Sequence, residues 1–292
     1  MSAVAAPASG PAAGAASGAG AGSGPASDGR AVAAVAGRRP LPDWAGGAIG
    51  IVSLLAVWQL LGMTVFSDNG AVPPPTGIVA QMLDDGWSFY WPNIRTTFRE
   101  AAQGWLWGNL LAVAVAALFV VLPITERPLM RLAIASYCLP IVAIGPILQI
   151  VFAGDAPKVV LAALSVFFTT LIGALVGLRS ADRLNLDLIH AYGGGGWAKL
   201  TKVRVWASLP SLFAGLRIAA PAAILGAIIG EYLGGESGLG IAMINSQQAL
   251  QVERTWGIAL VATAVAALAY GATALVGRLL TPWAPRAGRS GR

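Results

Sequence analysis

The chain has 292 residues, of which 56% are hydrophobic and only 11% are charged, and its mean hydropathy is +0.70. A soluble domain carries about 25% charged residues, so this composition excludes an ordinary soluble protein and favours a membrane protein. The formal net charge is +6, but no basic face is interleaved with stacking aromatic residues, and we expect no binding to nucleic acid.

The side chains that carry most enzyme chemistry are scarce. Cys138 is the only cysteine and His190 the only histidine, so the sequence offers no internal disulfide and no histidine cluster for a metal. It also contains no GxxxxGK[ST] phosphate-binding loop. We therefore expect no catalytic site, no metal, and no cofactor or ATP bound by this chain.

The N-terminal part differs from the rest. Residues 1–40 are rich in Ala, Gly, Ser and Pro, with almost no large apolar side chains that could offset the entropy lost on ordering. This composition predicts a disordered tail. Residues 41–283 then form a single membrane domain, and residues 284–292 form a short basic tail.

Long apolar runs define the membrane domain. A hydrocarbon core about 30 Å thick requires about 20 consecutive apolar residues per spanning helix. Runs of this kind are Trp44–Ser67, Ala101–Thr125, Leu132–Gly154, Val159–Leu178, Val205–Gly230 (interrupted only by Arg217) and Thr255–Gly277. Because lipid satisfies no backbone hydrogen bonds, each run should be a helix. The sequence predicts an all-α membrane protein with about six transmembrane helices, and Pro140 and Pro146 should bend the third.

The charged residues between these runs orient them. With six spans, one side of the membrane receives fifteen basic and five acidic residues, and the other receives four basic and eight acidic residues. Lysine and arginine mark the cytoplasmic face. We therefore expect a multi-pass protein of the cytoplasmic (inner) membrane with both termini in the cytoplasm and basic residues against anionic lipid.

The segment Asp187–Arg217 is basic and broken by glycines, unlike the apolar runs beside it. Leu184–Tyr192 can form a short helix and Trp197–Trp206 another, while the glycines between them permit the positive φ of a sharp bend. Tyr192 and Trp197 are rigid anchors of the kind found in binding hot spots, and Lys199 and Lys202 can meet lipid or a partner. The alternative interpretation is a solvated basic loop, which is common on the cytoplasmic side.

The spacing within this segment resembles the cytoplasmic motif of ABC importer permeases. Asp187 is followed six residues later by Gly193, and an aliphatic pair lies at Val203 and Val205. Other fragments are similar to the nitrate, sulfonate and taurine branch in the same order along the chain: Val72–Ile78, Thr97 and Arg99 with Gly104 and Gly108, Pro140 and Pro146, Phe167 and Phe168 with Gly177 and Leu178, Leu209–Arg217 and Gly238–Gly240. Each fragment is weakly specific, but the ordered series is strongly specific.

The resemblance implies a type I ABC importer permease with a short pair of cytoplasmic coupling helices. Its implied partners are an extracytoplasmic solute-binding protein, a second permease chain and a cytoplasmic ABC ATPase dimer, which binds the ATP. The implied coupling residues lie in one segment of the chain: Asp187, Tyr192, Gly193, Trp197, Lys199 and Lys202.

The motif also departs from the family pattern. Asp187 replaces the usual glutamate, Leu188 and Ile189 replace two alanines, and Trp206 replaces a proline. These changes leave the fit to an ATPase groove and the pairing of two identical chains open. A degenerate motif would suit one half of a heterodimer, so both a homodimer and a heterodimer of permeases remain possible.

The solute path is less marked in the sequence. Gln149, Asn245, Gln247 and Gln248 are polar residues in or beside apolar segments and are candidates to line it, although polar side chains in a bundle more often bond to neighbouring helices. Sulfonates, taurine, nitrate and vitamin precursors all stay open as solutes. The alternatives to an ABC permease are a secondary transporter, which would need ion-coupling residues, and a membrane scaffold without transport activity.

Overall fold

The structure is a computed structural model that describes residues 43–66 and 71–283. The predicted tails at 1–40 and 284–292 lie outside these residues. The chain divides after Ile51 into two units, and helix α1 (Asp43–Thr64) begins in the first of them. All elements that follow α1 belong to the second unit, which starts at Val52.

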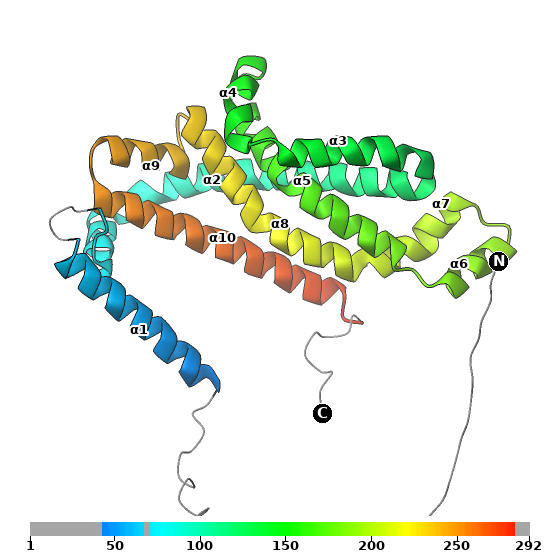
Figure 1. The fold of residues 1–292 in the computed structure, drawn as a ribbon, viewed down its shortest axis with the longest axis horizontal. Coiled ribbons are helices and arrows are strands. Elements are labelled where there is room, and N and C mark those ends of the chain that lie inside the picture. Colours follow the sequence, from blue (N-terminus) through cyan, green and yellow to red (C-terminus); the bar gives the residue numbers. More distant parts are fainter. Residues whose placement is uncertain (1–42, 67–70, 284–292) are drawn as a thin grey trace, which may run out of the picture. The chain divides into compact units, whose positions relative to one another are not determined.

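Within the described ranges every regular element is helical, as the sequence predicts (Figure 1). The elements that follow α1 are α2 (Pro75–Val121), η1 (Pro123–Thr125), α3 (Glu126–Cys138), α4 (Ile141–Val151), α5 (Ala156–Arg179), α6 (Arg183–Ala191), α7 (Gly196–Lys199), η2 (Leu200–Arg204), α8 (Val205–Gly234), α9 (Leu239–Gln248) and α10 (Val252–Leu280). Five helices in this part of the chain are long and apolar enough to cross a membrane, or six if the bent pair α3–α4 makes one crossing.

Helix α2 is longer than the predicted span that begins at Ala101. It starts in the proline-rich segment and is interrupted at Gly86, whose φ of 66° and ψ of 172° are not helical. The charged residues before Ala101 mark the end of the apolar run but do not disfavour helix, so the helix continues through them. Before the break, Asp85 accepts hydrogen bonds from the guanidinium Nε of Arg254 at 2.9 and 3.0 Å, which ties this part of α2 to α10.

The bend predicted within Leu132–Gly154 is present, and it divides this run into two helices. The chain bends by 101° between α3 and α4. Leu139 is extended because the proline ring that follows it disfavours helical backbone there, and Pro140 then caps α4. The bend therefore comes from Pro140, whereas Pro146 is accommodated inside α4.

Small residues let the central helices approach closely. Helix α5 packs against both α2 and α8 (Figure 1). Gly104 and Gly108 of α2 lie directly on the backbone of α5 at Val159 and Ala163. Gly226 of α8 meets the same helix at Leu161. This small-residue packing is how helices associate in lipid, where no hydrophobic force drives them together.

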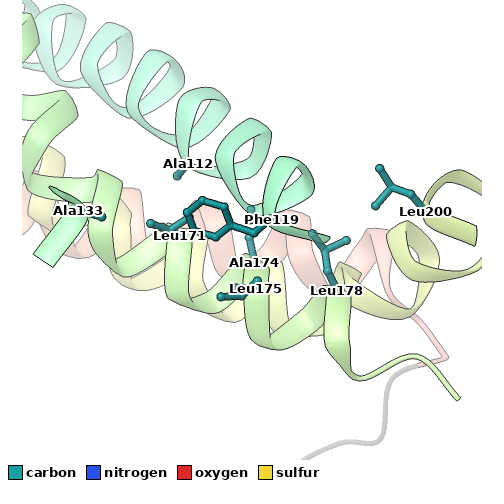
Figure 2. Close-up of a cluster of buried hydrophobic side chains, with 9 residues drawn as sticks. Ala112, Phe119, Ala133, Leu171, Ala174, Leu175, Leu178 and Leu200 are labelled. Carbon is teal, nitrogen blue, oxygen red and sulfur yellow. The ribbon is translucent and has the colours of Figure 1, made fainter. Parts of the chain in front are cut away.

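A cluster of buried apolar side chains fills the space between these helices at the end where α2 and α5 terminate. Figure 2 shows Phe119 of α2 lying over Leu171 and Leu175 of α5. Leu200, the first residue of η2, belongs to the same cluster and is 4% exposed. The segment after the glycine run is therefore part of the helical core.

Gly104 provides a test of this packing. A Cβ added there would collide with the Cβ of Ala162 and lie 2.8 Å from the carbonyl oxygen of Val159. Gly104→Ala should therefore destabilise the protein by about 1–3 kcal/mol through overpacking. Gly271→Ala is the matched control, because its Cβ would meet nothing within 4 Å and alanine favours helix. The midpoint of thermal unfolding in detergent should fall for the first variant and not for the second.

Candidate functional site

The segment between α5 and α8 forms a bent pair of short helices, which we call the hairpin (residues 182–204). Asp182 begins it: its carboxylate accepts a hydrogen bond from the backbone N–H of Leu184 at 3.1 Å and caps α6. This cap was not predicted from the sequence, although an aspartate directly before an apolar–polar run is a usual signal of a helix start. The predicted helix at Leu184–Tyr192 is confirmed within one residue, and the predicted start of the second helix at Trp197 lies one residue from the start of α7.

Gly193 makes the bend. Its φ is +78°, a region that L-residues rarely adopt. Its N–H donates to the carbonyl oxygen of His190 at 2.9 Å, and the N–H of Gly194 donates to that of Ile189 at 2.8 Å. These two bonds, with a left-handed glycine directly after the helix, form a Schellman motif that ends α6 and turns the chain. The predicted role of Gly193 as the bend fits this geometry.

The remaining predicted coupling residues lie on the hairpin with different exposures. Tyr192 is 84% exposed and Trp197 is 69% exposed. Asp187 and Lys202 are also exposed, and Lys199 is half-buried. The hairpin thus presents aromatic and charged groups on its surface.

The second half of the hairpin continues into α8 without a break. Helix α7 passes into the π-helical turn η2 and then into α8, whereas the sequence analysis placed the end of the short helix at Trp206. Leu200 in this run is buried in the core cluster with Phe119 and Leu178. The exposed aromatic surface is therefore joined to the central helices through continuous helix and buried contacts.

The opposite end of the bundle, where α5 begins and α8 ends, is polar and hollowed; we call it the polar end. Three open cavities of about 490, 460 and 260 Å³ adjoin there, and Ser237 lines all of them. Gln149 lines the cavity of about 460 Å³ beside Asp155 and Gly234. Asn245 lines the cavity of about 260 Å³.

The predicted path residues are thus only partly brought together. Gln149 and Asn245 line two adjoining cavities. Gln247 instead accepts a hydrogen bond from the hydroxyl of Tyr232 at 2.7 Å, which joins α9 to α8. Gln248 is exposed at the end of α9, and no cavity described here includes it among its lining residues.

Beneath the cavities lies a network of buried charged side chains that the sequence analysis did not identify. Lys158 donates to Glu100 at 3.0 Å and to Asp155 at 2.8 Å, and the side chains of Lys158 and Glu100 are 6% and 3% exposed. The carboxyl groups of Glu100 and Glu231 lie near each other, and the Oε2 atom of Glu100 is buried without a hydrogen-bond partner. Glu231, in the last turn of α8, is completely buried and accepts a hydrogen bond from Thr97 at 2.6 Å.

Several known proteins are similar to this chain in sequence. A probable ABC transporter permease protein of Haemophilus influenzae is 29% identical over 218 residues, which are 74% of this chain and 89% of that protein. The riboflavin transport system permease protein RibX of Chloroflexus aurantiacus is 30% identical over 239 residues, 80% of this chain and 88% of that protein. The taurine transport system permease protein TauC of Escherichia coli is 25% identical over 239 residues, 79% of this chain and 86% of that protein.

The sequence profile of one family matches residues 108–284, which is more than half of the chain. This range covers the hairpin, the buried lysine on α5 and the polar end of α8 and α9. The predicted resemblance to the branch that includes taurine permeases is confirmed by these relatives. The protein belongs to the binding-protein-dependent transport system inner membrane components, the permease subunits of ABC importers.

Proposed function

We propose that this permease subunit carries a small solute across the cytoplasmic membrane and is driven through its hairpin by an ATPase on the cytoplasmic side. The observation that carries the proposal is the hairpin itself. It presents Tyr192 and Trp197 to a partner at a bend set by Gly193, and it is continuous with α8 and buried in the core through Leu200. A helix seated in a partner's groove can transmit motion in this way because packed interfaces shift between discrete arrangements.

The charges at the two ends support the orientation. The end that carries the hairpin is rich in basic residues: Arg127, Arg131, Arg179, Arg183, Lys199, Lys202, Arg204 and Arg278. The polar end carries most of the acids, including Glu100, Asp155, Glu231 and Glu236. Because basic residues mark the cytoplasmic face, we place the hairpin and both termini in the cytoplasm, with the polar end facing outward.

The partners follow from the family. Its members work with a solute-binding protein and an ATPase, and we assign these a place at the polar end and at the hairpin respectively. ATP is bound and hydrolysed by a separate chain, so this subunit has no catalytic role and needs no cofactor of its own. A second permease chain, identical or different, completes the pathway.

Within the hairpin we assign roles residue by residue. Gly193 sets the bend, Tyr192 and Trp197 are the apolar anchors, and Lys202 contributes an exposed charge. Asp187 and Lys199 complete the contact surface. At the other end, Gln149 and Asn245 are the path-lining residues best supported by the cavities.

Removal of the tryptophan anchor should weaken ATPase binding. Exposed aromatic residues at the centre of an interface each contribute about 2 kcal/mol, so Trp197→Ala should lower the affinity for the ATPase roughly thirtyfold. Trp87→Ala is the control, because Trp87 is 67% exposed, close to the 69% of Trp197, but lies far along the chain in α2. Copurification of the ATPase from membranes measures the effect, and equal recovery with both variants would remove Trp197 from the contact surface.

The function is tested by reconstitution in proteoliposomes with an ATPase and a solute-binding protein that copurify with this permease. Uptake should require ATP, both partners and a loaded binding protein. Uptake that follows an ion gradient without ATP would identify a secondary transporter, and an assembled complex that never moves solute would identify a scaffold. Ligand screening of the binding protein then identifies the solute, for which riboflavin, taurine and related small molecules are the first candidates because relatives are named for them.

A further inference from the structure

Helix α9 begins with three consecutive backbone N–H groups that are all bound by side chains from other helices. The N–H of Gly238 donates to the Asn93 side-chain oxygen at 3.2 Å, and that of Leu239 donates to the Thr97 hydroxyl at 2.9 Å. The N–H of Gly240 donates to the Glu231 carboxylate at 2.7 Å. Asn93 and Thr97 belong to α2 and Glu231 belongs to α8.

This arrangement solves a specific problem at the start of α9. The first N–H groups of a helix have no partners inside the helix and need acceptors elsewhere. The cap residue Gly238 has no side chain to provide one, and its φ of 118° excludes most other residues. Leu239 is completely buried, so water cannot replace the missing acceptors. The caps must therefore come from outside the helix.

Two of the three caps are also linked to each other. The Thr97 hydroxyl donates to the second carboxylate oxygen of Glu231 at 2.6 Å, so one carboxylate joins α2, α8 and the start of α9. Because Glu231 and Thr97 are both completely buried, neither group can contact a solute.

Helix α9 in turn forms one wall of a cavity. Ile241, Asn245 and Ser246 of α9 line the cavity of about 260 Å³, with Asn93 opposite. The position of α9 therefore sets the shape of this cavity. Since α2 and α8 hold the start of α9, any shift between these two long helices must move the wall or break the caps.

We propose that Glu231, together with Thr97, is a positioning residue that holds α9 as the outer wall of the solute path and makes it follow α2 and α8. The inference rests on the proposed transport function. The caps act on solute passage at the polar end without touching the solute, and they leave the hairpin at the other end unchanged.

Thiol labelling of the assembled transporter tests the position of α9. The background is Cys138→Ser, which removes the only cysteine of the chain. Ser246→Cys then adds a nearly isosteric thiol on α9 at a site that is 3% exposed. We expect Glu231→Leu to raise the rate of maleimide labelling at position 246 about tenfold or more, because the carboxylate hydrogen bond to Gly240 of α9 is lost together with the one that joins Thr97 to α8. Thr97→Val should act in the same direction.

The conservative variant Glu231→Gln separates loss of the cap hydrogen bonds from a general loss of folding. In Glu231→Gln the amide oxygen can accept from Gly240 and the amide nitrogen can donate to Thr97, whose hydroxyl can then donate to the carbonyl oxygen of Asn93, 3.1 Å away. This variant should restore slow labelling and uptake. Glu253→Leu, which removes an exposed carboxylate at the same end, should leave both unchanged.

Uptake and ATP hydrolysis distinguish this inference from the transport function itself. Glu231→Leu should lower uptake at least tenfold while the complex still assembles and hydrolyses ATP. Unchanged labelling in Glu231→Leu, or labelling in Glu231→Gln as fast as in the leucine variant, overturns the positioning role. Absence of ATP-dependent uptake by the unaltered complex would instead contradict the proposed function, whatever the labelling shows.

Discussion

Replacement of Gly193 by valine is expected to abolish solute uptake while the chain remains folded and inserted. Gly193 has a φ of +78°, where a β-branched side chain clashes with its own backbone, at a cost of about 1–3 kcal/mol. The hairpin relieves this strain by giving up the Schellman bonds at His190 and Ile189. The bend then changes direction, and Tyr192 and Trp197 no longer present one surface to the ATPase.

Gly195→Val is the matched control for this prediction. A Cβ at Gly193 or at Gly195 would meet nothing within 4 Å, so neither substitution creates a steric contact. Gly195, however, has a φ of −80° and a ψ of −171°, which valine adopts readily. The two variants therefore differ mainly in backbone strain.

Three measurements read out the result: uptake in proteoliposomes, ATP hydrolysis stimulated by the loaded binding protein, and the amount of inserted chain. Gly193→Val should abolish uptake and stimulated ATP hydrolysis without changing the amount of inserted chain. Gly195→Val should leave all three quantities unchanged. Stimulated ATP hydrolysis that stays at the parent level in Gly193→Val would refute the coupling role of the bend.

The sequence predicts this hairpin well because its determinants are local. Asp182, Gly193 and Gly194 all act within six residues of their partners, and glycine at a helix end is a strong signal. The long helices are also predictable, since lipid requires long apolar runs and internally bonded backbone. Helix α2 extends beyond its apolar run, because charged residues interrupt the apolar segment but are compatible with helical backbone.

The position of the bend between α3 and α4 could not be predicted from the sequence alone. Pro140 and Pro146 lie in the same apolar run, and the sequence analysis assigned a bend to both. Proline restricts the residue before it and removes one N–H, but its effect depends on whether neighbours can satisfy the freed groups. Only the packing in space decides that Pro140 ends a helix and Pro146 continues one.

The buried charged network could not be predicted from the sequence, for a different reason. Lys158 and Glu100 are 58 residues apart, and Glu231 and Thr97 are 134 apart. Nothing in the local pattern around Glu231 distinguishes a solvated carboxylate at a helix end from a buried cap for another helix. The three-dimensional pairing of α2, α5 and α8 alone makes the distinction.

Loss of the positive charge of Lys158 should be the most damaging single change to stability. Lys158 and Glu100 are almost completely buried, and removal of one partner of a buried ion pair costs about 3–5 kcal/mol because the other charge is left uncompensated. Lys158→Met keeps the apolar stem, which packs against Gly230, and so isolates the charge.

Two further variants test whether the lost stability comes from the charges of this pair. Lys158→Met combined with Glu100→Gln removes both charges and should recover most of the lost stability, because neutral residues of similar size can replace a buried pair at little cost. Asp155→Asn should cost less than about 1 kcal/mol, since the Asp155 side chain is 69% exposed and its ion pair is screened by solvent.

The midpoint of thermal unfolding, followed by the fluorescence of the ten tryptophans, measures all three variants in the same detergent. A large fall for Lys158→Met, near recovery in the double variant and little change for Asp155→Asn would establish that the buried charge balance holds α2 and α5 together. If the double variant were no more stable than Lys158→Met, the lost stability would not come from the uncompensated charge of Glu100, and the ion pair would not be what holds α2 and α5 together.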